Sequence, residues 1–224
     1  MELKNYQIQV IRDLERFLEL LIEKQSISSA YSTLWNEKGV NVGIDGMPPY
    51  KTELAGVPQV CFKVPTGGGK TFLAANSIKP IFDSMPHIHP KAVVWLVPSD
   101  AILTQTYRTL TDKNHDYRKK IDVDFGNKVE IYSKQQLLNG QNFNPTSVSD
   151  NLSVFVLSYD SFRTSKKDGR KAYQENGSLL PFVRFKQDSG SLLEDTDETA
   201  LIQVIRKLNP VVIVDESHHA TSKL

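Results

Sequence analysis

The sequence lacks several features that mark particular classes of protein. Its 224 residues include one cysteine, Cys61, so no disulfide framework can form within the chain and an intracellular location is favoured. Because Cys61 stands in an apolar run, we expect a buried, reduced thiol. No apolar run is long enough to span a bilayer, and the N-terminus has no secretion-signal pattern. These absences predict a soluble, cytoplasmic protein that does not insert into a membrane.

An excess of charge of either sign is also lacking. The 27 lysines and arginines nearly balance the 26 aspartates and glutamates, so no global field draws the protein to nucleic acid or to a membrane. Any contact with nucleic acid must therefore be local. One short polar stretch could make such a contact with phosphates, or could simply be a solvated loop, since it concentrates five cations: Arg163, Lys166, Lys167, Arg170 and Lys171.

The first part of the chain is predicted to be helical. Apolar residues recur at spacings of three and four over residues 5–24, which is typical of an amphipathic helix, and a second helix is expected over 28–38. Residues 39–58 are rich in glycine and proline and are expected to form a loop. We therefore expect an N-terminal helical segment over residues 1–56.

From residue 57 onwards, short apolar runs alternate with helical patterns. Runs without polar alternation suit strands buried on both faces, so we predict an α/β domain over 57–224 with a parallel sheet flanked by helices. The polar stretch 160–195 is interpreted as an insertion or flexible excursion. The expected strands are 60–64, 93–97, 129–132, 154–157 and 211–214, and the expected helices include 70–82, 99–111 and one from Asp195 or Thr196 to Asn209.

The stretch "VPTGGGKT" between an apolar run and a helix is the strongest chemical signal in the chain. Three glycines let the backbone turn tightly and bring N–H groups close to phosphate oxygens, which is the arrangement of a phosphate-binding loop. Lys70 would reach the β- and γ-phosphates, and Thr71 would offer its hydroxyl to Mg²⁺. The full pattern has glycine where this chain has Val64, and a glycine-rich helix-capping turn is the alternative. The predicted loop residues are Thr66, Gly67, Gly68, Gly69, Lys70 and Thr71.

A pair of acidic residues follows the apolar run "VVIV". The carboxyl end of a parallel strand is where ligands bind, so Asp215 is expected to hold Mg²⁺ and Glu216 to act as the catalytic base that activates water. An acidic cap on the next helix is the alternative interpretation. Lys70, Asp215 and Glu216 are thus the predicted catalytic residues.

Together these segments resemble motifs I and II of superfamily 2 helicases in their Asp-Glu-x-His form. "NYQIQVI" is similar to the glutamine motif, which implies that Gln7 contacts adenine through its carboxamide. The resemblance also implies that His218 couples the nucleotide site to a later motif. "VVWLVPSDAILTQT" and "VFVLSYDSF" resemble segments that touch the nucleic-acid backbone, which implies contacts through Pro98, Ser99, Gln105, Ser158 and Tyr159.

The amino-acid sequences of these motifs most resemble those of the restriction subunit of type III restriction enzymes. That resemblance implies a RecA-like domain, ATP and Mg²⁺ as cofactors, and movement along DNA, expected to be double-stranded, with a methyltransferase as a possible partner subunit. The family continues with motif III, a second RecA-like domain and a nuclease domain. The chain is therefore expected to be an N-terminal fragment whose sheet lacks the motif III strand.

Other functions compete with this one. A nucleotide-binding module without turnover is the first alternative, and a phosphate-loop kinase or transporter ATPase is the second, although the Gln7 segment and the Asp-Glu-x-His order disfavour it. The residues do not distinguish DNA from RNA. His87 and His89 have chelate-like spacing, but no acid or thiol stands near them in sequence, so metal binding there is not expected.

Overall fold

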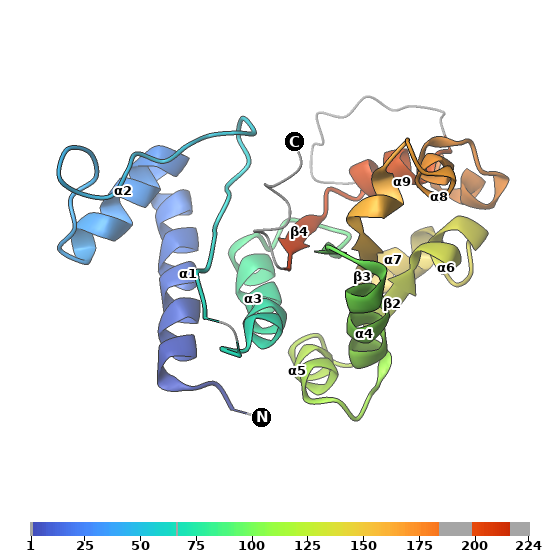
Figure 1. Cartoon of the computed structure of the whole chain (residues 1–224), viewed down its shortest axis with the longest axis horizontal. Coiled ribbons are helices and arrows are strands. Elements are labelled where there is room, and N and C mark those ends of the chain that lie inside the picture. Colours follow the sequence, from blue (N-terminus) through green and yellow to red (C-terminus); the bar gives the residue numbers. More distant parts are fainter. Residues whose placement is uncertain (1, 66, 184–198, 216–224) are drawn as a thin grey trace. The chain divides into compact units, whose positions relative to one another are not determined.

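The structure is a computed structural model that describes residues 2–65, 67–183 and 199–215. The chain divides into two compact units, Met1–Met85 and Pro86–Leu224, and each is described by itself (Figure 1). The phosphate loop groups with the N-terminal helices in the first unit. The expected domain boundary after residue 56 stays a prediction.

The first unit consists of helices and the loops that join them. The helix predicted over 5–24 is confirmed at both ends, because the chain turns at Gln25, whose φ is 49°, and Ser26 caps the next helix by accepting the Ser29 N–H at 3.3 Å. The two N-terminal helices pack through the apolar stripe of Phe17 and Leu20. The helices of this unit are α1 (Asn5–Lys24), α2 (Ile27–Glu37) and α3 (Lys70–Ser84).

Two expectations for the segment before the phosphate loop are wrong. Residues 60–64 form no strand, because no neighbouring strand pairs with them among the described residues, and a strand is stable only when its N–H and C=O groups are paired. Instead, Val64 is buried against Ile11 and Leu73. Cys61 is exposed rather than buried. In this segment only alternate side chains face the helices, and Cys61 is not one of them.

The second unit is built around a parallel sheet. The strand order is β2-β3-β1-β4, and all three strand pairs are parallel. The central strand β3 is buried at every position, as expected of a strand covered on both faces. Four of the five predicted strands are therefore confirmed: β1 (Ala92–Val97), β2 (Val129–Ser133), β3 (Leu152–Ser158) and β4 (Val211–Val214).

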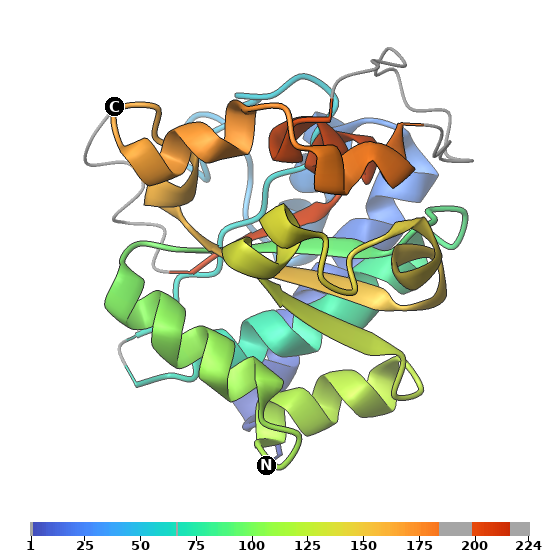
Figure 2. The same ribbon diagram turned by 90° about the vertical axis from the view of Figure 1, so that its right-hand side faces the viewer.

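Helices cover both faces of this sheet, which confirms the predicted α/β class. Figure 2 shows α4 and α5 in green on one side and α8 and α9 in orange to red on the other. The apolar core on the second side joins Val94 and Phe155 of the sheet to Val204 of α9. The helices of this unit are α4 (Asp100–Thr111), α5 (Asp116–Asp124), α6 (Lys134–Asn139), α7 (Pro145–Asp150), α8 (Lys167–Arg170) and α9 (Leu201–Lys207). None of the described helices is long and apolar enough to cross a membrane.

The polar stretch that begins at residue 160 is folded as far as residue 183. Short 3-10 turns η1 (Tyr159–Phe162), η2 (Lys171–Tyr173) and η3 (Gly177–Phe182) flank α8 within it. Leu179 and Phe182 are fully buried in the core of the sheet. Residues 160–183 thus contain helical turns that buried apolar side chains join to the core of the sheet. The expected start of the last helix at Asp195 or Thr196 lies outside the described residues.

Candidate functional site

At residues 67–69 the predicted phosphate loop has the backbone shape of an anion-binding turn. Gly67 and Gly69 have φ values of 76° and 74°, and Gly68 between them lies outside that left-handed region. The Gly68 N–H closes the turn on the Pro65 carbonyl at 2.9 Å, and the Leu73 N–H donates to the Gly69 carbonyl at 2.9 Å to begin α3. Such alternation turns successive N–H groups toward one concavity. The loop therefore fits a phosphate group.

Sterics require glycine at two of these positions. A Cβ on Gly68 would lie 2.5 Å from Val64 Cγ1, and a Cβ on Gly69 would lie 2.7 Å from Gln7 Nε2. Val64 stands where the full phosphate-loop pattern has glycine. The Val64 side chain is buried in the core between α1 and α3. The valine therefore anchors the start of the loop to these two helices.

The first turn of α1 contacts the loop directly. Gln7 is buried, and its Nε2 donates to the Gly68 carbonyl at 3.0 Å, while its Oε1 accepts the Lys4 N–H at 2.8 Å. The hydroxyl of Tyr6 donates to the same carbonyl at 2.7 Å. The structure thus brings Gln7 to the loop, although its contact with adenine stays a prediction. The sequence analysis did not identify Tyr6. The feature that could have pointed to it is a tyrosine directly before the glutamine of the motif.

Lys70 and Thr71 form the first turn of α3. Both side chains are partly buried, and they follow the loop without any intervening residue. The first turn of a helix leaves free N–H groups and the positive end of the helix dipole, which together attract an anion. Of the predicted loop residues, Thr66 lies outside the described residues.

In the second unit, the predicted acid and nucleic-acid residues gather at one edge of the sheet. Parallel strands end at the same edge, and the register pairs Val97 with Ser158 and Leu96 with Val214. Asp215 extends this ladder, since its N–H donates to the Leu96 carbonyl at 2.9 Å. The ends of β1, β3 and β4 thereby place five predicted residues at this edge: Pro98, Ser99, Ser158, Tyr159 and Asp215.

These residues differ in what they expose. Ser99 and Gln105 are both exposed; Ser99 caps α4 by accepting the Ile102 N–H at 3.4 Å, and Gln105 lies on the second turn of that helix. Ser158 is buried, and its hydroxyl is hydrogen-bonded to the hydroxyl of Ser161. The Tyr159 hydroxyl is buried without a hydrogen-bond partner among the described residues, and its pKa is raised by burial and then by the charge of Asp215. A nucleic-acid contact at Ser158 and Tyr159 is thus better made by backbone than by hydroxyl groups.

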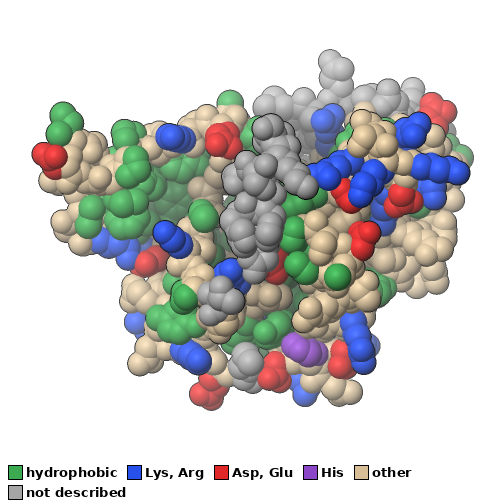
Figure 3. All heavy atoms as spheres, viewed as in Figure 1, with side chains coloured by type: hydrophobic (Ala, Val, Ile, Leu, Met, Phe, Trp, Pro, Cys, Tyr) green, Lys and Arg blue, Asp and Glu red, His purple; other side chains and the backbone are tan. Residues whose placement is uncertain are grey.

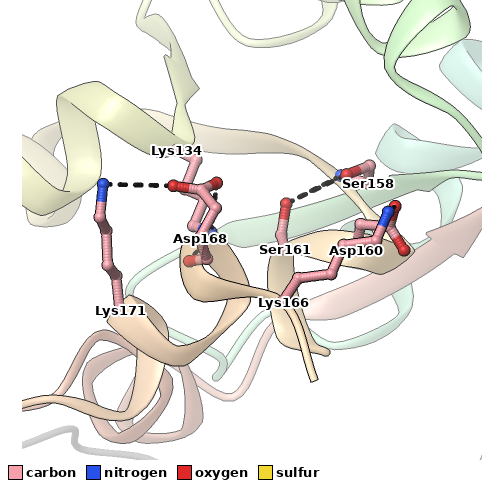
Figure 4. A network of polar contacts seen from close by, with 7 residues as sticks. All are labelled: Lys134, Ser158, Asp160, Ser161, Lys166, Asp168 and Lys171. Atoms are coloured by element: carbon pink, nitrogen blue, oxygen red, sulfur yellow. Dashed lines mark hydrogen bonds and ion pairs between the residues drawn. The ribbon is translucent and has the colours of Figure 1, made fainter. Parts of the chain in front are cut away.

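A compact basic segment follows β3 at this edge; we call residues 160–173 the basic hook. Figure 4 shows how two carboxylates fix it: Asp160 pairs with Lys166, and Asp168 bridges Lys134 at 2.9 Å and Lys171 at 3.3 Å. These hydrogen bonds hold the pKa of Asp160 and of Asp168 below the usual aspartate range. The hook is therefore linked internally by ion pairs, while most of its side chains are exposed to solvent.

The basic hook carries a surplus of positive charge. With Lys134, its six cations against two carboxylates leave a net charge of +4. Lys167 and Arg170 take part in no ion pair within the described residues. Figure 3 shows lysine and arginine side chains gathered around α8.

Metal ligands are sparse in the described residues. No group of three or more His, Cys, Asp or Glu there could hold a metal ion, which includes the surroundings of His87 and His89. Mg²⁺ does not need such a cage, because it is commonly held by one or two carboxylates together with substrate phosphates and water. Asp215, only 9 % exposed at the sheet edge, is a carboxylate of this kind. Glu216 and His218 lie outside the described residues.

Comparison with known proteins agrees with the sequence motifs. The model of the family described as "Type III restriction enzyme, res subunit" matches residues 1–224, the whole chain. No curated protein and no solved structure gave a significant match.

Proposed function

Because the chain belongs to the type III restriction enzyme res-subunit family, we propose that it is the ATP-binding motor domain of a DNA-dependent translocase in a restriction system. The observation that carries this proposal is the glycine loop with two left-handed residues at the start of α3. Its backbone shape suits a polyphosphate, whereas a plain N-terminal cap has extended backbone and needs no left-handed glycine.

Each candidate residue has a role in this proposal. The N–H groups of Gly67 and Gly69 bind the β- and γ-phosphates, and Lys70 adds a positive charge there. Thr71 and Asp215 are the proposed magnesium ligands, and the ion, when bound, neutralises negative charge on the phosphates. Glu216 is the proposed base that takes a proton from the attacking water.

DNA is the proposed track. Ser99 and Gln105 are exposed at the carboxyl edge of the sheet, and the basic hook lies at the same edge with its net charge of +4. A fixed group of cations suits the regular phosphates of a nucleic-acid backbone. A methyltransferase partner subunit and a cytoplasmic location belong to the same proposal.

An ATPase assay with and without double-stranded DNA tests the motor. We expect turnover that DNA stimulates, that Lys70→Ala abolishes and that Lys79→Ala preserves, because Lys79 lies on the same helix but pairs with Asp83 on the surface. Nucleotide binding without turnover in any condition would favour the alternative, a binding module. No binding of ATP at all would refute both.

DNA binding is tested by the salt dependence of affinity. Replacing all five basic-hook cations with serine should weaken binding and flatten its salt dependence. A more specific test is the double variant Lys167→Ser with Arg170→Ser, which breaks no ion pair among the described residues. It should lower the slope of log affinity against log salt concentration by up to about 2. The matched control is Lys113→Ser with Lys119→Ser, two exposed lysines away from the hook. Equal effects of the two pairs would refute the hook as interface, and tighter binding of RNA would redirect the proposal to RNA.

The role of Gln7 needs its own test. If its carboxamide contacts adenine, Gln7→Ala should reduce the preference for ATP over GTP. An intact preference would show that Gln7 does not select the base.

A further inference from the structure

One carbonyl of the phosphate loop receives two hydrogen bonds from α1. The Gly68 oxygen accepts from the Tyr6 hydroxyl at 2.7 Å and from Gln7 Nε2 at 3.0 Å. A carbonyl oxygen has two lone pairs, so these two donors satisfy it fully. The donor end of Gln7 is itself fixed, because its Oε1 accepts the Lys4 N–H at 2.8 Å.

The direction of this carbonyl decides the direction of the next N–H group. A peptide unit is planar and trans, so its C=O and N–H point in opposite directions. With the Gly68 oxygen held toward α1, the Gly69 N–H points away from α1. That N–H is one of the donors at the start of α3, where an anion is favoured.

Nothing else in the loop sequence fixes this peptide. Both of its residues are glycines, which adopt left- and right-handed backbone conformations with little difference in energy, so rotation of the unit meets no side-chain barrier. The rotated peptide would turn a carbonyl oxygen toward the bound phosphates and repel them. A glycine-rich phosphate loop therefore needs an external restraint on this bond.

We propose that Tyr6 is a positioning residue for polyphosphate binding, which holds the Gly68–Gly69 peptide so that the Gly69 N–H faces the phosphates. This inference rests on the proposed function of the loop. Gln7 is the second restraint on the same carbonyl. Tyr6 does not touch the base, so its effect is the same for every nucleotide that carries the same phosphates.

Tyr6→Phe isolates this role. The side chain is 42 % exposed, so removal of one oxygen leaves its packing unchanged. The matched control is Tyr31→Phe, because Tyr31 lies in the same unit and its hydroxyl also donates to a backbone carbonyl, that of Pro48, at 3.2 Å. Both changes delete one phenol-to-carbonyl bond, but only the first deletes it at the loop.

The experiment measures the affinities of ATP, GTP and inorganic tripolyphosphate for the wild type and the two variants. Loss of one hydrogen bond predicts that Tyr6→Phe weakens all three ligands by the same factor, about two- to twelvefold, and that Tyr31→Phe weakens none. The Gly69 amide resonance should also shift less on binding tripolyphosphate in Tyr6→Phe than in the wild type, a readout that a change in overall stability does not move.

Three results would overturn the inference. Unchanged affinities in Tyr6→Phe would show that the bond does not position the loop. A loss confined to ATP would place Tyr6 at the base. If the wild type binds none of the three ligands, the proposed function fails together with the inference, whereas normal wild-type binding with an unaffected variant removes only the inference.

Discussion

At the scale of single residues, the loop shows how a departure from a motif can be compatible with its function. Val64 replaces a glycine of the full pattern, yet its Cγ1 lies where it would touch any side chain at position 68. The side chain of Val64 is buried against Ile11 and Leu73. Position 64 thus tolerates a side chain because it faces α1 and α3. Positions 68 and 69 do not, because they form the turn.

Gly69→Ala tests that requirement. The residue has a φ of 74°, and an added Cβ would lie 2.7 Å from Gln7 Nε2, so the variant must move the loop or the glutamine. We expect polyphosphate affinity to fall by about tenfold or more, since a left-handed alanine alone costs about 1–2 kcal/mol. Gly126→Ala is the control, because it has a φ of 60° with nothing within 4 Å. Equal binding by both variants would contradict a specific role of Gly69.

At the scale of elements, one buried arginine joins three of them. Arg118 of α5 donates to Asp122 at 2.8 Å, to the Leu110 carbonyl of α4 at 3.1 Å and to the Val129 carbonyl of β2 at 3.0 Å. The arginine satisfies a helix end and a strand start that would otherwise be buried without partners. This pair has a structural role and lies outside the candidate site.

Arg118→Met should therefore destabilise the fold strongly. Its side chain is 8 % exposed and that of Asp122 is 13 % exposed, so the substitution leaves a buried carboxylate without its partner. Removal of one member of such a pair costs about 3–5 kcal/mol, measurable as a lower midpoint of urea unfolding. Arg108→Met, on the exposed face of α4, should change stability by less than about 0.5 kcal/mol. A similar small effect of both would contradict the role of Arg118.

The basic hook should respond to pH through Asp168. Lys134 first, and then Lys171, lower the pKa of this carboxyl in the folded protein. A lowered folded pKa means that the stabilisation is present above the unfolded pKa and is lost as pH falls through the folded pKa. The difference in melting temperature between wild type and Asp168→Asn should thus be largest near neutral pH and shrink below the usual aspartate range. Asp168 is largely exposed, so the difference is small, and one that grows on acidification would contradict the assignment.

At the scale of the whole molecule, charge is balanced overall and concentrated locally. The net charge of the chain is +1, whereas the basic hook with Lys134 carries +4. Any attraction to a nucleic acid must therefore act at short range and from one edge of the sheet, and salt should weaken it.

Binding of nucleotide should stabilise the whole chain by mass action. A ligand at 100 times its dissociation constant adds about 2.7 kcal/mol, which for a chain of this length corresponds to a rise in melting temperature of roughly 5–10 °C. We expect this rise with ATP and Mg²⁺ in the wild type and not in Lys70→Ala. An equal rise in both proteins would show that nucleotide binds elsewhere.

Local sequence predicted much of the fold and part of the site. The helix Asn5–Lys24 and the strand Val211–Val214 match the prediction at both ends, because unbroken periodicity and β-branched runs bounded by turn residues are local signals. The predicted strand at 60–64 failed because strand formation depends on a pairing partner, which periodicity cannot report. The exposure of Cys61 and the folding of residues 160–183 were missed for a similar reason, since both depend on which distant residues pack there.

The sequence alone predicted a backbone suited to phosphate, because three glycines in a row followed by a lysine and a threonine are typical of a phosphate-binding loop. Only the tertiary structure decided which groups hold that backbone in place. Tyr6 and Gln7 reach Gly68 from more than 60 positions away. The same holds for the edge where Asp215 meets the ends of β1 and β3, since the register of parallel strands is a property of the folded sheet and not of any one segment.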